Sequence, residues 1–220
     1  MIKRITFILF AVLLIAGCGS GNRTAADEAL ELAKRHMEGD STLSADTALA
    51  LEYFHSAAQK GNAEAQYYLG YYYQNGTGLE KDSLRSLKWY KKSARSGFAQ
   101  AQNRMGMLYY NGREVEQDYR KAIRWFTRAA EQGYDQAQYM LGIIYSRGRG
   151  TEPDTALAVH WLEKSAAGGH PYPEYLLGKL LYETAETPEE TEIARQWVKS
   201  AADKGVGHAK ELLYQLTKNN

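Results

Sequence analysis

The sequence predicts an all-α solenoid of about five helix-turn-helix repeats, each 36 residues long. The four tryptophans of the chain, Trp89, Trp125, Trp161 and Trp197, stand 36 residues apart. A fixed interval of about 20 to 50 residues is typical of stacked repeats, which act as binding scaffolds more often than as single enzyme cores. The same interval relates three sets of small residues: Gly70, Gly106, Gly142 and Gly178; Ala94, Ala130, Ala166 and Ala202; and Gly97, Gly133, Gly169 and Gly205.

The first residues precede this array and have the pattern of a secretory signal. A basic start at residues 1–4 is followed by an apolar run at residues 5–16 and then by small residues. As a helix, the apolar run would span roughly 18 Å, which is short against the roughly 30 Å of a bilayer core. The segment therefore predicts a leader rather than a membrane-spanning helix.

Ile15-Ala16-Gly17-Cys18 resembles the lipobox of bacterial lipoproteins. The resemblance implies a signal peptide at residues 1–17, and a lipidated Cys18 with a short tether over residues 18–26. Gly19, in place of an aspartate after the cysteine, implies an outer-membrane destination facing the periplasm. Cys18 is the only cysteine, so the chain has no intramolecular disulfide. The alternative that stays open is a secreted protein with an incidental cysteine.

The composition after the leader is close to neutral. Removing Lys3 and Arg4 from the 27 basic residues leaves 25, against 26 acidic ones. No basic stripe or arginine-rich run is apparent in the sequence, so nucleic acid is not expected as a partner. With 17 tyrosines and four prolines, the chain has the composition of a packed helical protein.

Residues 65–100 show how one repeat is predicted to fold. Ala65, Leu69 and Tyr72 share one face of a first helix. The glycines within 76–78 end that helix, because glycine adopts the positive-φ conformations that other residues resist. A second helix follows, with Trp89 and small residues on its apolar face.

Each predicted second helix starts at an acidic residue. In the second repeat this residue is Asp82, whose carboxylate can accept a free backbone N–H and complement the helix dipole. Because each acid belongs to a different helix start, capping is favoured over a shared carboxylate site. The equivalent positions in the other repeats hold Asp46, Asp118, Asp154 and Glu190.

Aligned on the 36-residue interval, the first helices read AQYYLGYYYQNGTG, AQNRMGMLYYNGRE, AQYMLGIIYSRGRG and PEYLLGKLLYETAE. The tryptophan segments read LKWYKKSARSG, IRWFTRAAEQG, VHWLEKSAAGG and RQWVKSAADKG. This pattern resembles the Sel-1-like repeat, a relative of the tetratricopeptide repeat, over roughly residues 29–208. The first repeat departs from it, with Lys34 in place of the central glycine. The solenoid is predicted over residues 27–220, with repeats at about 29–64, 65–100, 101–136, 137–172 and 173–208 and a capping helix at 209–217.

The resemblance implies a right-handed superhelix with a concave groove that binds another protein. Members of the family commonly serve as adaptors or assembly factors, in bacterial envelopes among other places, which favours a lipid-anchored interaction scaffold. Others neutralise toxins, so an immunity protein against a toxin delivered to the periplasm is the alternative. Cysteine-rich members have been linked to β-lactam binding, but this chain lacks their cysteines, and a hydrolase is the weakest interpretation.

The face of each first helix opposite the framework residues is the predicted partner-binding groove. It comprises the positions two, six and nine residues after each repeat start, and half of these twelve positions are tyrosines. Tyrosine offers a rigid contact area with a polar tip and is favoured at interaction hot spots. The alternative is that the rings pack one repeat against the next. The predicted groove residues are Tyr67, Tyr71, Met107, Tyr110, Tyr139, Ile143, Tyr175, Lys179 and Tyr182.

No catalytic, metal or cofactor site is predicted. The five histidines are scattered, and none has the spacing or the cysteine company of a zinc site. No nucleophile elbow or phosphate-binding loop occurs. The predicted partner is another envelope or periplasmic protein, with a toxin as the alternative. Membrane contact is expected through the lipid anchor alone, and no small-molecule substrate is expected.

Overall fold

The computed structural model describes residues 24–39 and 45–218, and within these residues the protein is entirely helical. Ten helices form five antiparallel pairs, and an eleventh, α12 (Gly207–Lys218), follows the last pair. The first helices of the pairs are α2 (Ala25–Glu38), α4 (Ala63–Asn75), α6 (Ala99–Asn111), α8 (Asp135–Arg147) and α10 (Pro171–Thr184). The second helices are α3 (Thr47–Gln59), α5 (Ser83–Arg95), α7 (Tyr119–Ala130), α9 (Thr155–Ala166) and α11 (Pro188–Asp203).

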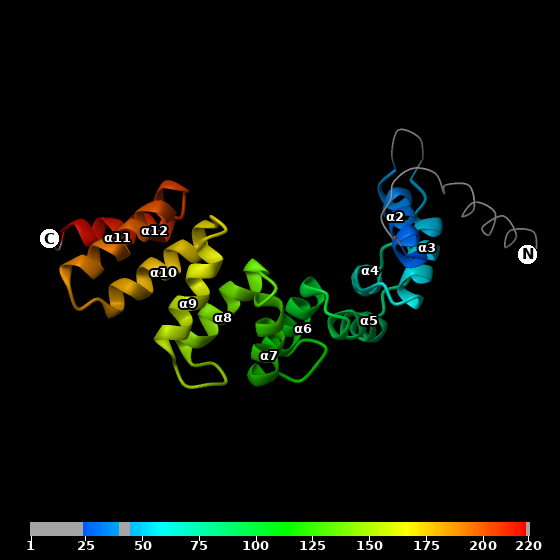
Figure 1. Ribbon diagram of the computed structural model, residues 1–220, viewed down its shortest axis with the longest axis horizontal. Coiled ribbons are helices and arrows are strands. Elements are labelled where there is room, and N and C mark those ends of the chain that lie inside the picture. The colour runs from blue at the N-terminus through cyan, green and yellow to red at the C-terminus, as the bar shows by residue number, and fades with distance from the viewer. Residues whose placement is uncertain (1–23, 40–44, 219–220) are drawn as a thin grey trace, which may run out of the picture.

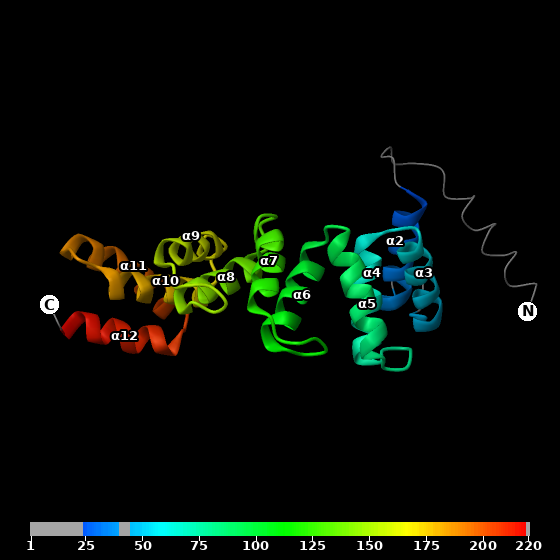
Figure 2. The ribbon, with the colours of Figure 1, turned by 90° about the horizontal axis from the view of Figure 1, so that it is seen from below.

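The pairs follow one another along the long axis of the molecule, with the first and the last pair at opposite ends (Figure 1). The array bows, so that in this view α5 to α8 lie below the two ends, and the perpendicular view in Figure 2 shows the same sequential order. Each pair packs on its neighbours in the chain. The predicted solenoid is confirmed. The predicted leader and the lipidation site Cys18 lie outside the described residues.

The acidic residues begin four of the five second helices as predicted. The carboxylates of Asp46, Asp82, Asp118 and Asp154 each accept the backbone N–H three residues later, at 2.8 to 3.0 Å. The fifth second helix differs, because α11 begins earlier and is capped by Thr187. Glu190 therefore stands inside the first turn, where its side chain accepts the backbone N–H of Thr187 in a capping box. The expectation that Glu190 marks the helix start was wrong by one turn.

The repeated central glycine lets the two helices of a pair approach closely. A Cβ atom built on Gly106 would lie 2.6 Å from the ring of Phe126, and one on Gly142 would lie 2.6 Å from Leu162. In each repeat from the second on, the residue in this contact is the one directly after the tryptophan, and it is fully buried. These contacting residues are Tyr90, Phe126, Leu162 and Val198.

The tryptophans join one repeat to the next. Trp89 packs against the core cluster that contains Phe54 of the preceding repeat, and Trp161 belongs to the cluster that contains Phe126. Trp125 is half-buried against the cluster built around Tyr90. The fixed tryptophan interval in the sequence therefore reflects a contact between successive second helices.

Buried glutamines provide a second link between repeats. Gln66, Gln102 and Gln138 each donate a side-chain N–H to a backbone carbonyl at the end of the preceding second helix, at 3.1 to 3.2 Å. In the fifth repeat this position is Glu174, and a carboxylate has no proton to donate to a carbonyl. Glu174 is 4% exposed and instead accepts from Ser200 and pairs with Lys204.

The last described helix, α12, has the register of a first helix. Tyr214 occupies the position of the central glycine there and is 59% exposed. The buried hydrophobic residues that the structure describes all lie between Ala26 and Leu216. A fragment of residues 24–220 therefore contains all of them.

We predict that Gly106→Ala lowers the free energy of unfolding by about 2 kcal/mol, although alanine is the better helix former. The added methyl group collides with Phe126, and the second helix must shift. The control is Gly207→Ala, where the added Cβ atom meets nothing within 4 Å. Urea unfolding of both variants tests the prediction. Equal stability of the two would show that the central glycine is not required for packing.

Candidate partner-binding surface

The predicted groove residues separate into two groups in the structure. Those at the second and ninth positions after each repeat start are half-buried, and their rings lie at the joints between repeats. Those at the sixth position form a row of their own along the first helices. The half-buried group comprises Tyr67, Tyr110, Tyr139, Tyr175 and Tyr182.

Tyr67 illustrates the joint positions. Its ring centroid lies 5.4 Å from that of Phe98, which directly precedes α6, and 5.5 Å from that of Tyr90; the ring also packs against the cluster that contains Met105 of α6. Burial raises the pKa of the Tyr67 hydroxyl above its ordinary value. Tyr67 is therefore a packing residue, and only part of its ring is accessible to solvent.

Tyr110 is held by the following repeat. Its hydroxyl accepts a hydrogen bond from Arg149 at 2.7 Å, and its ring meets that of Tyr119 edge-on with the centroids 5.3 Å apart. Tyr139 packs against two core clusters, and burial raises the pKa of its hydroxyl. Tyr175 stacks on His208 at 6.3 Å. The packing alternative considered for these rings therefore has direct structural support.

The first-helix row is the set of equivalent sixth positions. Its aromatic member, Tyr71, is 46% exposed. Met107 and Ile143 are half-buried against the same core cluster and keep one side open. Lys179 is exposed at the far end, 3.7 Å from Glu183. The row therefore consists of Tyr71, Met107, Ile143 and Lys179.

Exposed amide side chains flank the apolar part of this row. Asn75 and Asn111 lie four residues after Tyr71 and Met107, which places them on the same helix face one turn later. Gln100 and Gln136 stand at the starts of α6 and α8 and are also exposed. Amides both donate and accept hydrogen bonds, so an apolar row between them suits a polypeptide, which carries both kinds of backbone group.

Two residues near this row were missed in the sequence interpretation. Tyr172, at the start of α10, is 60% exposed and lies one position before the repeat start, outside the three positions considered. Arg104 is half-buried on α6, with its guanidinium carbon 5.6 Å from the centre of the Tyr90 ring. Exposure of one helix face depends on the neighbouring repeats, so the sequence contained no direct signal for either residue.

A basic surface was also missed. The outward sides of α5 and α7 carry a cluster of exposed lysines and arginines that no run in the sequence announces. The sequence interpretation expected no basic stripe. The structure instead exposes the lysines and arginines of α5 and α7, which the near-neutral overall composition does not reveal.

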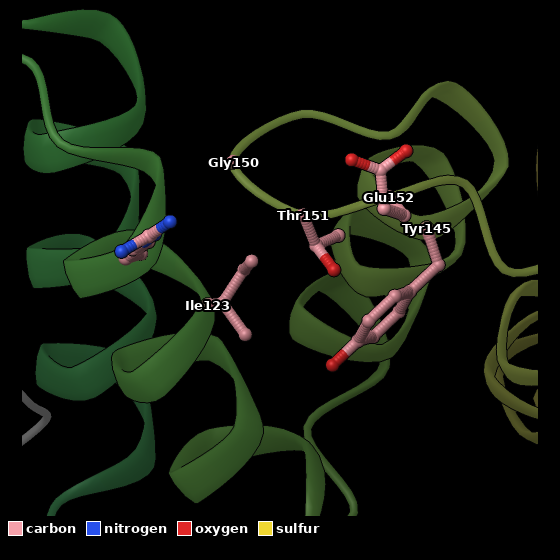
Figure 3. Close-up of a pocket in the computed structure, with 6 residues that line it drawn as sticks. Ile123, Tyr145, Gly150, Thr151 and Glu152 are labelled. Carbon is pink, nitrogen blue, oxygen red and sulfur yellow. The ribbon is translucent and has the colours of Figure 1, made fainter.

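An open cavity of about 620 Å³ lies between α7 and the α8–α9 loop. Figure 3 shows Ile123 on one side of the cavity and Tyr145 and Thr151 on the other, with Gly150 in the loop that borders it. None of the predicted groove residues lines it. Within residues 24–39 and 45–218 there is no group of three metal-ligating side chains, and no helix is long and apolar enough to cross a bilayer.

The repeat pattern matches a known family over most of the chain. The model of the Sel1 repeat matches residues 29–62, 63–98, 99–134, 135–170 and 174–206. The chain belongs to the Sel1 repeat family. Sel1 repeats are generally non-enzymatic scaffolds that bind other proteins.

Solved structures of this family resemble the chain in fold. A protective antigen of uropathogenic Escherichia coli, described as displaying an SLR fold, is 32% identical with a TM-score of 0.79. The match covers 87% of this chain but 41% of the E. coli chain, so this protein spans about two fifths of that relative. A Sel1 repeat protein from Oxalobacter formigenes is 28% identical with a TM-score of 0.73, over 86% of this chain and 74% of the other.

A Pseudomonas aeruginosa immunity protein also matches, at 18% identity and a TM-score of 0.41, over 90% of this chain and 84% of the other. Likeness at this level carries no functional argument. No curated protein matches the sequence. The comparisons therefore establish the family and its general role in binding proteins.

We predict that Tyr67→Ala and Tyr71→Ala have different effects on stability, although both remove a tyrosine from the same helix. Tyr67→Ala removes ring contacts at a joint and should lower the free energy of unfolding by about 2 to 3 kcal/mol. Tyr71→Ala should cost less than about 1 kcal/mol because nearly half of the side chain is exposed. Urea unfolding measures both. Equal losses would mean that Tyr71 is also a packing residue.

Proposed function

We propose that this protein is a lipid-anchored interaction scaffold of the bacterial cell envelope. It acts as an adaptor or assembly factor and binds a segment of another envelope protein along the first-helix row. Tyr71, Met107 and Ile143 contact apolar side chains of the partner, and the flanking amides bind its backbone. The observation that carries this proposal is the partly exposed apolar row on a scaffold of the Sel1 repeat family.

The exposure of the row supports the proposal. A surface aromatic such as Tyr71 loses little conformational entropy on binding, because its ring has two side-chain torsions. Met107 and Ile143 are already ordered by packing on one side, so the apolar strip is formed before a partner arrives. The joint residues Tyr67, Tyr110 and Tyr139 present edges to the same groove and fix its curvature through their packing.

The sequence supports anchoring at the membrane. The apolar leader and Ile15-Ala16-Gly17-Cys18 together match the signal for lipidation of Cys18. Acyl chains contribute about 0.8 kcal/mol for each buried CH₂ group, so more than one chain gives stable attachment. The glycine after Cys18 favours the outer membrane, with the repeats in the periplasm.

Affinity capture from envelope extract tests the groove, using residues 24–220 as bait. We predict that the unchanged bait retains a partner and that a Tyr71→Ser, Met107→Gln bait loses it. The matched control is Tyr214→Ser, which removes an exposed tyrosine from α12, 59% accessible against 46% for Tyr71. Thermal unfolding establishes that the three baits remain folded.

Each outcome of the capture has a distinct meaning. Retention of a partner by all three baits contradicts the groove and places binding elsewhere on the solenoid. If no bait retains a protein, a resident envelope partner is contradicted. The immunity alternative then becomes the hypothesis to test, with toxins supplied from outside the cell.

Lipidation is tested separately in cells grown with an alkyne-labelled fatty acid. We predict that the full chain incorporates the label and sediments with membranes. A Cys18→Ser variant should incorporate no label and leave the membrane fraction, because the thiol that carries the lipid is absent. Labelling of both proteins, or of neither, would contradict lipidation at Cys18.

A further inference from the structure

The second helices of the second and third repeats form a basic face that the proposed groove does not use. We define this basic face as the exposed lysines and arginines of α5 and α7. Neither helix contains an acidic residue. Five cations lie on α5 and four on α7: Arg85, Lys88, Lys91, Lys92 and Arg95, and Arg120, Lys121, Arg124 and Arg128.

Most of these charges have no counter-ion in the described structure. Arg85 pairs with the capping Asp82 at 3.1 Å, and Lys121 pairs with Asp118 at 2.9 Å. The remaining cations form no ion pair within residues 24–39 and 45–218. Uncompensated like charges on neighbouring turns repel one another. Binding of a negatively charged partner relieves this repulsion and is therefore favourable.

The two helices are held as neighbours by the tryptophans. Trp125 of α7 packs against the cluster that contains Tyr90 and Ala94 of α5. Cations lie over the tryptophan rings on the outer side, with Lys92 5.2 Å from the Trp89 ring centre and Arg128 4.9 Å from that of Trp125. The exposed cations therefore belong to the second helices of two consecutive repeats, which share one core cluster.

The other second helices do not extend this surface. α3 contains no lysine or arginine, α9 contains one of each sign, and α11 begins with an acidic segment. The basic face is therefore restricted to the middle of the array. It also points away from the first-helix row, because the two helices of a repeat pack through their buried sides, as Gly70 and Tyr90 do.

We propose that the basic face docks the solenoid on the anionic phospholipid surface of its membrane. This inference rests on the proposed lipid anchor, which brings the repeats close to the headgroups. A few acyl chains and a basic surface act together, and lysines and arginines near an anionic leaflet each add to the attraction. Docking through α5 and α7 leaves the first-helix row facing the aqueous side, open to its partner.

The form of the surface favours lipid over an acidic protein. Most of the charged ends belong to long, exposed side chains that form no ion pair, which suits mobile headgroups better than a defined set of carboxylates. Leu84, on the same outward side of α5, is 71% exposed and is available to enter the headgroup region. Of the cations of the basic face, Arg120 of α7 lines the cavity of about 620 Å³.

The test is co-sedimentation of residues 24–220, without the lipid, with two kinds of vesicle. We expect binding to equimolar phosphatidylglycerol and phosphatidylcholine, little binding to pure phosphatidylcholine, and loss of binding as salt screens the charges. The patch variant Lys88→Gln, Lys91→Gln, Arg124→Gln should bind on the order of ten- to a hundred-fold more weakly. The control variant Arg147→Gln, Lys199→Gln, Lys210→Gln removes the same charge elsewhere and should bind like the unchanged protein.

Three results would overturn the inference: no binding to anionic vesicles, equal loss in the patch and control variants, or tighter binding to poly-glutamate or duplex DNA than to the vesicles. The Tyr71→Ser, Met107→Gln variant should bind vesicles normally. Failure of docking is therefore distinguishable from failure of the groove, which is measured by capture of a protein, and from failure of anchoring, which is measured by labelling at Cys18.

Discussion

The close approach of the two helices in the second to fifth repeats is the constraint on which the rest of the structure depends. A glycine at the centre of the first helix leaves space for the residue after the tryptophan, and in the third repeat these residues are Gly106 and Phe126. This contact fixes the spacing of each pair. The tryptophan and the buried glutamine then attach the pair to the preceding repeat, through a ring contact and a hydrogen bond to a carbonyl.

Because each pair buries its inner sides, a solenoid of this kind has two independent outer faces. The first helices present a narrow apolar row between amides, and the second helices of the middle repeats present lysines and arginines. One face suits a polypeptide and the other suits a negatively charged surface. A scaffold tethered near a membrane can use both faces at once, since contact on one side does not cover the other.

The sequence predicted the helices well because its periodic residues act locally. The capping aspartates bind backbone groups of their own first turn, and the glycines that follow α2 to α9 and α11 adopt positive φ angles. Glu190 was misplaced by one turn because Thr187 is an equally good cap and Pro188 favours the first helical position, so two local signals competed. The 36-residue interval pointed to Glu190 as the cap, and it could not show that Thr187 caps the helix instead.

The sequence by itself determined the repeat interval, the all-helical fold and the family, because each rests on residue type and spacing. The leader and the lipidation of Cys18 stay predictions. Tertiary structure alone decided which tyrosines pack and which are exposed: Tyr67 and Tyr71 lie one turn apart on the same helix, but only Tyr67 faces the next repeat. It also decided that the cations of α5 and α7 are all exposed. Both outcomes depend on the angle between successive repeats, which arises from the packing of many side chains and has no counterpart in the periodicity.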